Sequence, residues 1–342
     1  MSAPRSGLLA GGNWIIDFVK MIDVYPGEDA LANIGESAPG TNGGAPYNVL
    51  MDLARLGVSF PLEAVGLIGS DANGELILAD CRERAIDLSQ LQRTSEAPTS
   101  FTDVMTVSDT GRRTFFHCRG TNALLRPEHF DFSKTRAKIF HLGYLLLLDE
   151  LDLPDAAFGT QAGAVLARAR AAGLLTSVDV VSEEGRRFAS VVLPTLPQVD
   201  ILFVNEFEAQ RITGKTLKTP AGFDWIAMKE AAQDLLDAGV QQWVFLHCED
   251  GAIALGKNGQ IACQGSLQLP ASFIRGTTGA GDAFAAGVLA GLHEENPVAE
   301  CLRWGVTAAA ASLRHPSASQ GIASLPECLA LAAIHGYRQL PD

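Results

Sequence analysis

The segment formed by residues 276–292, GTTGAGDAFAAGVLAGL, constrains the fold more than any other part of the sequence. The threonines and glycines at its start disfavour a regular helix or strand, whereas the apolar run after them favours a buried helix. The junction near residues 279–282 is therefore a loop that leads into a helix N-terminus. Unpaired N–H groups there attract anions, and Gly279 and Gly281 let an anion approach the backbone, so we expect a phosphate ligand.

Asp282 would stand beside the bound anion. Like charges repel, so a carboxylate is a poor phosphate ligand, but it is well suited to take a proton from a hydroxyl that attacks phosphorus. The alternative is that Asp282 only caps the helix and interacts with its dipole, as many aspartates at helix starts do. The spacing alone leaves both interpretations open.

Other phosphate-binding motifs fit the sequence less well. The glycine order from Gly276 is G-x-x-G-x-G, which differs from the dinucleotide fingerprint G-x-G-x-x-G. Residues 214–216 (GKT) resemble the end of a P-loop, but the glycine expected five positions earlier is Ala209, within a predicted helix. The sequence contains no HRD or DFG string, which argues against a protein kinase.

Composition narrows the class of partner and the compartment. The chain has 342 residues, with 39 acidic and 26 basic side chains and a net charge of −13, which argues against nucleic acid and anionic membranes as partners. The six cysteines form no C-x-x-C pair, as in a reducing compartment, and no apolar run has membrane-spanning length. The first ten residues lack the apolar core of a secretory signal. We therefore expect a cytoplasmic protein.

The N-terminal third predicts strands and a glycine-rich loop. We expect residues 1–11 to form an N-terminal tail and residues 12–342 to form one α/β domain. Residues 14–19 predict the first strand, in which Asp17 lies at an exposed end or points into a site. A glycine-rich loop over residues 40–48 precedes a predicted helix over residues 49–56. Residues 101–107 and 113–118 alternate around a turn and predict an antiparallel ribbon.

From residue 138 onward, strand and helix patterns alternate. This pattern predicts a parallel sheet covered by helices, with a ligand crevice at the carboxyl ends of the strands. Asn205 and Glu208 fall at such an end, where they would serve a metal or phosphate-bound water, or else cap a helix and face solvent. The histidines, including His117 and His247, show no metal-ligand spacing, so we interpret them as structural.

Four segments, which follow one another along the chain in the order typical of the family, together resemble the PfkB, or ribokinase-like, carbohydrate kinase family. Gly43, Gly44, Asn48 and residues 53–57 (LARLG) are similar to its N-terminal signature, and residues 277–284 (TTGAGDAF) to its C-terminal one. Residues 66–71 (GLIGSD) with Gly74, and residues 205–208 (NEFE), match further family elements. The resemblance implies a ribokinase-like α/β/α sandwich built on a parallel sheet, with a small β-sheet lid drawn from about residues 12–42 and 98–122.

The same resemblance implies ATP-dependent phosphorylation of a sugar hydroxyl. It makes Asp282 the base, and the backbone amides of Gly279, Ala280 and Gly281 would hold the transferring phosphoryl charge. The residues expected at the sugar are Asp17, Gly43, Gly44 and Asn48. Those expected at the nucleotide are Asn205, Glu208, Thr277 and Gly251, of which the first two would bind Mg²⁺ through water. The lid is expected to exclude water and to offer a homodimer contact.

The sequence departs from the family pattern at three places, one of which is His247, where a small residue is common in the nucleotide loop. Gly276 stands where many members carry an aspartate tied to a monovalent cation site, so activation by potassium is doubtful. Residues 179–182 (DVVS) lack the asparagine and arginine that several sugar-acid kinases carry after that aspartate.

The acceptor is left open by the sequence. Arg113, with Arg112, Arg119 and Asn122 near it, indicates a polar or acidic sugar, or else a solvated strand face. Candidate acceptors are fructose, ribose and 2-keto-3-deoxygluconate. The alternatives are a nucleoside kinase, with residues 115–116 (FF) stacking a base, and a catalytically silent sugar-binding protein.

Overall fold

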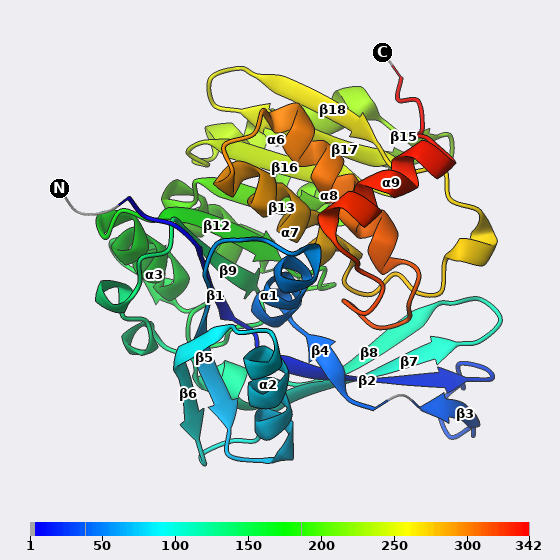
Figure 1. Ribbon diagram of the computed structural model, residues 1–342, viewed down its shortest axis with the longest axis horizontal. Helices are drawn as coiled ribbons and strands as arrows, with labels where there is room; N and C mark the ends of the chain where they lie inside the picture. The colour runs from blue at the N-terminus through cyan, green and yellow to red at the C-terminus, as the bar shows by residue number, and fades with distance from the viewer. Residues whose placement is uncertain (1–3, 38, 186, 342) are drawn as a thin grey trace.

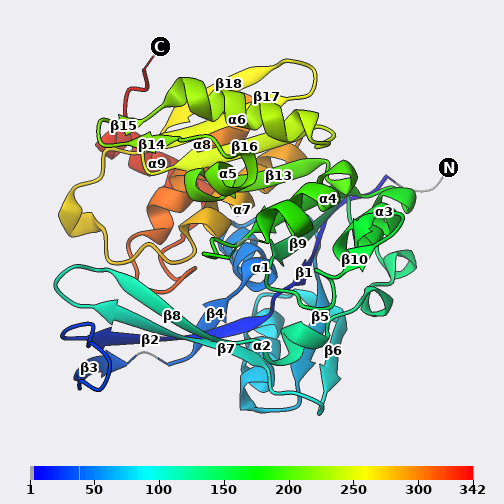
Figure 2. The same ribbon diagram turned by 180° about the vertical axis from the view of Figure 1, so that it is seen from behind.

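The structure is a computed structural model that describes residues 4–37, 39–185 and 187–341. Residues 1–3 of the expected tail therefore lie outside the described residues. Across the described ranges, a nine-stranded sheet with helices on both faces forms the body, and a smaller sheet extends from one side of it (Figures 1 and 2). The predicted α/β/α sandwich with a small second sheet is thus confirmed.

The large sheet is mostly parallel. In spatial order its strands are β18 (Ile261–Gly265), β17 (Gly251–Gly256), β16 (Trp243–Cys248), β13 (Ile201–Asn205), β12 (Leu175–Val180), β9 (Ile139–Leu145), β1 (Leu8–Gly12), β5 (Leu62–Gly69) and β6 (Asp87–Thr94). The strands from β16 to β6 pair in parallel, whereas β17 and β18 are antiparallel. The expectation of a parallel sheet is wrong at this edge, because so short a turn between β16 and β17 can only join antiparallel strands.

Strand β1 corrects the expected N-terminal tail. Residues 8–11, which were assigned to that tail, belong to β1, which pairs with β5 on one side and β9 on the other and is fully buried. A strand buried on both faces shows no alternation of polar and apolar residues, so its short apolar run resembled a tail. The first strand is therefore β1, and the segment predicted as first is the second, β2 (Ile15–Ile22).

Helices cover both faces of the large sheet. The face seen in Figure 1 carries α1 (Ala45–Leu56), α2 (Ala72–Glu83), α7 (Ala280–His293), α8 (Val298–Ser312) and α9 (Leu325–His335). The opposite face, seen in Figure 2, carries α3 (Gln161–Ala171), α4 (Leu193–Thr195), α5 (Glu206–Thr213) and α6 (Trp225–Asp237). Successive residues of β1 alternate between the two cores, with Leu8 and Ala10 in one and Leu9 in the other. No helix within the described residues is long and apolar enough to cross a membrane.

The smaller sheet projects from the body at the end of β1. It contains β2, β3 (Ile34–Ser37), β4 (Thr41–Gly43), β7 (Ser100–Val107) and β8 (Arg113–Cys118). Strands β7 and β8 form the predicted antiparallel ribbon, and β2 runs parallel to β7. Residues of β7 alternate strictly between buried and half-buried, so one face of this sheet is covered and the other meets solvent.

Gly12 is where the chain leaves the large sheet, and it offers a sharp test of the fold. Its φ is 123°, and a Cβ there would lie 2.0 Å from the carbonyl oxygen of Gly143. We expect Gly12→Ala to lower the free energy of unfolding by several kcal/mol, because both the backbone conformation and the contact reject a side chain. Denaturant titration measures this loss.

Gly57 provides the matched control for that substitution. Its φ is 78°, but a Cβ there would meet no atom within 4 Å. Gly57→Ala should therefore cost only about 1–2 kcal/mol, the penalty of a left-handed residue. Equal losses in the two variants would contradict the close approach of Gly12 and Gly143.

Candidate active site

Two adjoining cavities lie at the carboxyl ends of the central strands. The first, of about 490 Å³, is lined by the smaller sheet, the start of α1 and the ends of β9, β12 and β13. The second, of about 730 Å³, is lined by β17, α8 and the chain near Leu267. Asn205, Thr277, Ala280 and Gly281 line both cavities, so the glycine-rich loop stands where they meet.

Asp282 lies at the head of α7, on the floor of the first cavity. Gly279 precedes the helix with a left-handed φ of 75°, and Asp282 falls in the first turn with 4% of its surface exposed. Asn48 donates to its Oδ2 at 2.8 Å, and the Tyr144 hydroxyl donates at 2.7 Å. Asn42 in turn donates to Asn48 Oδ1 at 2.6 Å, which orients the Asn48 amide toward the carboxylate. A helix cap alone would not need this set of partners.

Four buried carboxyl groups face the first cavity: Asp17, Asp179, Glu208 and Asp282. Burial raises the pKa of Asp282 to about 6 and the pKa values of Asp17 and Glu208 to about 7. Burial also raises the pKa of Asp179 well above its usual range, and the charges of Asp282 and Glu208 add to this rise. The cavity therefore favours hydrogen-bond donors and cations.

Asp17 points into the site rather than lying at an exposed strand end. It is 8% exposed and lines the first cavity from β2 of the smaller sheet. Gly43 makes room for it, because a Cβ at Gly43 would lie 2.4 Å from Asp17 Cγ. Gly44 follows with a φ of 81° and is the N-cap of α1, which places Asn48 one turn into that helix. The glycine-rich loop thus brings Asp17 and Asn48 to the same cavity.

Asn205 and Glu208 lie at the end of β13, as the sequence predicts. Asn205 caps α5, and Glu208 reaches back to accept from the Asn205 backbone N–H at 2.9 Å. Glu208 also accepts from Ser182 Oγ at 2.7 Å and is 3% exposed, so it is not a solvated side chain. Both residues line the first cavity, which makes a cap and a ligand-binding role compatible.

The residues present fit a hydrated divalent cation. Within the described ranges, no group of three or more histidine, cysteine, aspartate or glutamate side chains is arranged to hold a metal directly. Mg²⁺ commonly binds through one or two carboxylates, substrate phosphates and retained waters, which demands less of the protein. Glu208, buried beside Asn205 with a raised pKa, gains from a nearby cation because positive charge stabilises its ionised form.

The second cavity combines an apolar wall with a polar edge. Leu267, Leu269, Val306, Ala309 and Ala310 form part of the wall. Gly251, expected at the nucleotide, lines it too, and a Cβ there would lie 2.5 Å from the carbonyl oxygen of Gln264. An apolar slot that opens onto a helix N-terminus suits a flat base joined to phosphates.

The arginines near the smaller sheet separate into two groups. Arg113 lines both cavities, and its guanidinium donates to the hydroxyls of Thr277 and Thr278 in the glycine-rich loop. Arg119 instead pairs with Asp149 at 2.9 Å. Arg112 and Asn122 line neither cavity, and Asn122 bonds the backbone of Trp14. Of the sequence-based candidates for an acidic sugar, Arg113 alone reaches the site.

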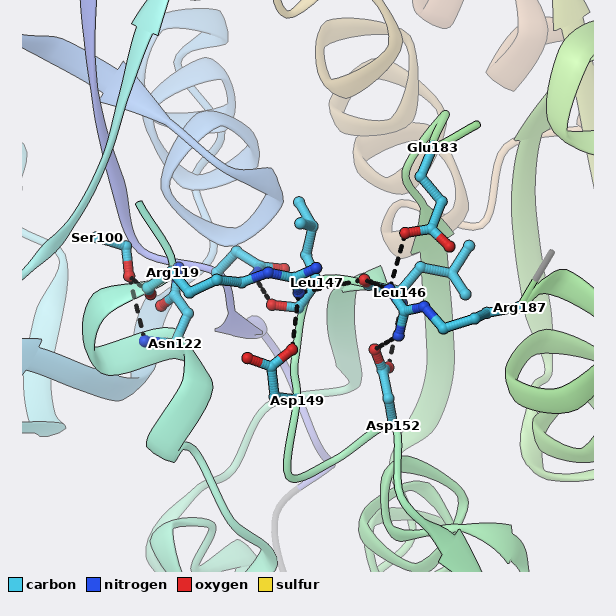
Figure 3. Close-up of polar contacts among 10 residues, drawn as sticks. Ser100, Arg119, Asn122, Leu146, Leu147, Asp149, Asp152, Glu183 and Arg187 are labelled. Carbon is cyan, nitrogen blue, oxygen red and sulfur yellow. Dashed lines mark hydrogen bonds and ion pairs between the residues drawn. The ribbon is translucent and has the colours of Figure 1, made fainter. Parts of the chain in front are cut away.

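Figure 3 shows what holds the loop that follows β9. The carbonyl oxygen of Leu146 accepts from Arg119 at 3.3 Å and also from Arg187. Arg187 pairs with Asp152 at 3.1 Å and with Glu183 at 2.8 Å. Tyr144, near the end of β9, and Leu147, in this loop, both line the first cavity. Tyr144 had no sequence signal, because it reaches Asp282 only through the folding of β9 beside β1.

Asp52 is a buried acid behind the site. It is fully buried on α1, one turn beyond Asn48, and neither carboxylate oxygen has a partner with hydrogen-bond geometry in the described part of the chain. Burial raises its pKa well above the usual range, against the opposing influence of Ser319, and the charge of Asp282 raises it further. The pKa of Asp52 is higher in the folded protein than in the unfolded chain. The contribution of protonated Asp52 to stability is therefore full below about pH 4 and is lost as the pH rises.

We expect Asp52→Asn to stabilise the protein at neutral pH. Asparagine cannot ionise, so replacing a buried acid that must take up a proton on folding should gain about 1–3 kcal/mol of unfolding free energy at pH 7, and the gain should shrink toward pH 4. Thermal unfolding at several pH values measures it. Glu83→Gln, at an exposed position, is the control, and a gain of equal size at pH 4 and pH 7 would contradict this account.

Comparison with known proteins places this geometry in a family. The pattern of the pfkB family of carbohydrate kinases matches residues 15–325. A ribokinase from Arabidopsis thaliana is 30% identical over 310 residues, covering 90% of this chain and 75% of that protein. An ATP-dependent ribose-1-phosphate kinase from Halopiger xanaduensis is 28% identical over 330 residues, covering 95% of this chain and 96% of that protein.

A solved structure agrees with the sequence comparisons. The Arabidopsis thaliana ribokinase complexed with ribose and ATP superimposes with a TM-score of 0.74 at 24% identity, covering 97% of this chain and 99% of the other. At this identity the likeness concerns the fold. Together with the family match over residues 15–325, it shows that the chain belongs to the pfkB family of carbohydrate kinases and is an enzyme of that class.

Proposed function

We propose that this protein transfers the γ-phosphate of ATP to a hydroxyl of a sugar, with Asp282 as the base. The observation that carries the proposal is the position of Asp282 between a cavity rich in carboxylates and a helix N-terminus that adjoins an apolar slot. A base and an anion-binding loop at the junction of two substrate cavities suit phosphoryl transfer, which depends on positioning and charge stabilisation.

In the proposed reaction, the acceptor occupies the first cavity. Asp17 accepts hydrogen bonds from sugar hydroxyls, Asn48 and the backbone at Gly43 and Gly44 complete the contacts, and Asp282 removes the proton of the attacking hydroxyl. Water excluded by the smaller sheet cannot compete for the phosphoryl group. We accordingly propose that this sheet is a lid of a single kinase domain. We also propose that the protein is cytoplasmic.

The nucleotide occupies the second cavity in this proposal. Gly251 and the apolar wall hold the base, while Thr277 and the amides of Gly279, Ala280 and Gly281 hold the phosphates. Mg²⁺, held through water by Asn205 and Glu208, would neutralise phosphate charge when bound. Support for ATP comes from the names of the Halopiger xanaduensis kinase and of the Arabidopsis thaliana ribokinase complex. A monovalent cation is not assigned, because Gly276 offers no carboxylate.

Arg113 is proposed to bind substrate from the lid. Its guanidinium is close enough to Asp17 for their charges to interact, and it touches both threonines of the glycine-rich loop. Such a position suits a phosphate or carboxylate group on the part of the acceptor nearest Arg113, or the transferring phosphoryl group itself. Ribose, fructose and 2-keto-3-deoxygluconate, or a phosphorylated form of such a sugar, are the acceptor classes to examine.

A nucleoside kinase is the second candidate. Phe115 lines the first cavity and is 54% exposed, so its ring is available to stack a base. Phe116 lies on the other face of β8 and does not line either cavity, which leaves one aromatic ring where the sequence suggested two. That outer face is where we would look for a homodimer contact.

The first test is ADP formation from Mg-ATP against a panel of sugars, sugar acids, sugar phosphates and nucleosides. We expect one acceptor class to give turnover, and Asp282→Asn to lower kcat by about 10²–10⁴-fold, the usual contribution of a general base. Asp237→Asn, on the exposed end of α6, is the control and should retain full activity. Equal rates for the Asp282 variant and wild type would remove Asp282 as the base.

The raised pKa values predict the pH dependence of the reaction. Asp282 must be ionised to take a proton and Asp17 to accept hydroxyls, and their pKa values are about 6 and about 7. We expect kcat/KM to fall as the pH drops from 7 to 5, with a slope steeper than one decade per unit below pH 6. Asp17→Asn should weaken acceptor binding and reduce that slope. A flat profile from pH 7 to pH 5 would contradict both assignments.

A further inference from the structure

The cavity-facing side of the lid carries a row of polar side chains that crosses three strands. Asp17 in β2 is in register with Thr102 in β7, and Thr102 is in register with His117 in β8. Residues in register on neighbouring strands point to the same face, and all three line the first cavity. Thr102 Oγ1 and His117 Nδ1 are 3.0 Å apart, and the Thr102 side chain opposes the rise that burial causes in the pKa of Asp17.

The far end of this row is unpaired. His117 Nε2 is buried and has no hydrogen-bond partner among residues 4–37, 39–185 and 187–341. Burial, with a smaller influence from Arg119, lowers the pKa of His117 to about 4, so the ring is neutral at pH 7. A buried polar atom without a partner is costly, and in a substrate cavity the substrate is the natural partner.

The positions of the protons in the row determine whether His117 Nε2 donates or accepts a hydrogen bond. Asp17 must be ionised in the proposed function, and an ionised carboxylate can only accept, so it draws the single hydroxyl hydrogen of Thr102. The Thr102 oxygen then accepts from His117 Nδ1–H. A neutral imidazole carries one N–H, so Nε2 presents its lone pair to the cavity.

We infer that His117 binds the acceptor substrate by accepting a hydrogen bond from one of its hydroxyls at Nε2, and that the row Asp17–Thr102–His117 selects acceptors with hydroxyl donors at both of its ends. This inference rests on the proposed function and names the substrate class: a polyol with a free hydroxyl on the His117 side. A carbonyl or carboxylate at that position has no proton to share with Nε2. An anionic group on the acceptor therefore belongs at the Arg113 end of β8.

The inference differs from the interpretation of His117 as a structural histidine. The sequence offered no signal, because the row forms only when β2, β7 and β8 pair in this register. Asp17 and Thr102 are neighbours in the row and can bond each other. His117 uses one nitrogen for Thr102 and presents the second to the cavity.

The test uses the best acceptor from the panel and its deoxy analogues, each lacking one hydroxyl. His117→Phe keeps a flat ring and removes both nitrogens. We expect it to lower kcat/KM for the parent acceptor by about tenfold or more, mainly through KM, while KM for ATP is unchanged. For one deoxy analogue, the one lacking the hydroxyl bound by Nε2, wild type and variant should have equal kcat/KM.

Two further variants separate recognition from structure. His117→Gln, whose amide oxygen can accept, should recover part of the loss, and Thr102→Val should lower kcat/KM for the same hydroxyl because it frees the imidazole proton to move to Nε2. Asp237→Asn, at the exposed end of α6, is again the control and should match wild type. If His117→Phe lowers kcat/KM by the same factor for every deoxy analogue, or has no effect on any acceptor, the inference is wrong.

Failure of the inference is distinct from failure of the proposed function. A wild-type protein that phosphorylates no member of the panel contradicts the proposed function, and this inference falls with it. A wild-type protein that phosphorylates an acceptor with unchanged selectivity in His117→Phe contradicts this inference alone.

Discussion

A buried carboxylate at the start of a helix is the constraint on which the structure depends. Asp282 is held by Asn48 from α1 and by Tyr144 near the end of β9, so three separate segments must meet within hydrogen-bond distance. The close approach of Gly12 to Gly143 fixes how the end of β9 lies against β1. Close packing of the central strands therefore sets the geometry around Asp282, because any shift of β9 against β1 would move Tyr144.

The electrostatics of the first cavity follow from the same burial. Four carboxyl groups with raised pKa values surround a space in which, among the described residues, Arg113 supplies the one lining guanidinium. Such an arrangement costs stability when all four are ionised, and ligands that donate hydrogen bonds or carry positive charge relieve the cost. Polyols and hydrated cations are ligands of this kind. Binding such a ligand therefore lowers the electrostatic cost of the four buried carboxyl groups.

Local patterns in the sequence were sufficient to predict much of this. The two glycine-rich loops, the helices after them and the Asn205–Glu208 pair depend on turn and cap chemistry within a few neighbouring residues. Strand β1 was missed because it is buried on both faces, and β6, whose sequence is largely polar, because it shows no apolar alternation. The contact of Tyr144 with Asp282 was missed for a different reason: the two residues come from separate segments, and the pairing that brings them together is not encoded in any short segment.

The carbonyl of Leu146 has a consequence for motion. It joins Arg119, just after the last lid strand, to Arg187, whose other partners include Glu183 beside the first cavity. One backbone oxygen thus connects the root of the smaller sheet to a residue that lies two positions after Tyr144. Any movement of the smaller sheet that carries Arg119 away must either break this hydrogen bond or move Leu146 with it. The contact at Leu146 therefore couples the position of the smaller sheet to the segment that holds the Asp282 carboxylate.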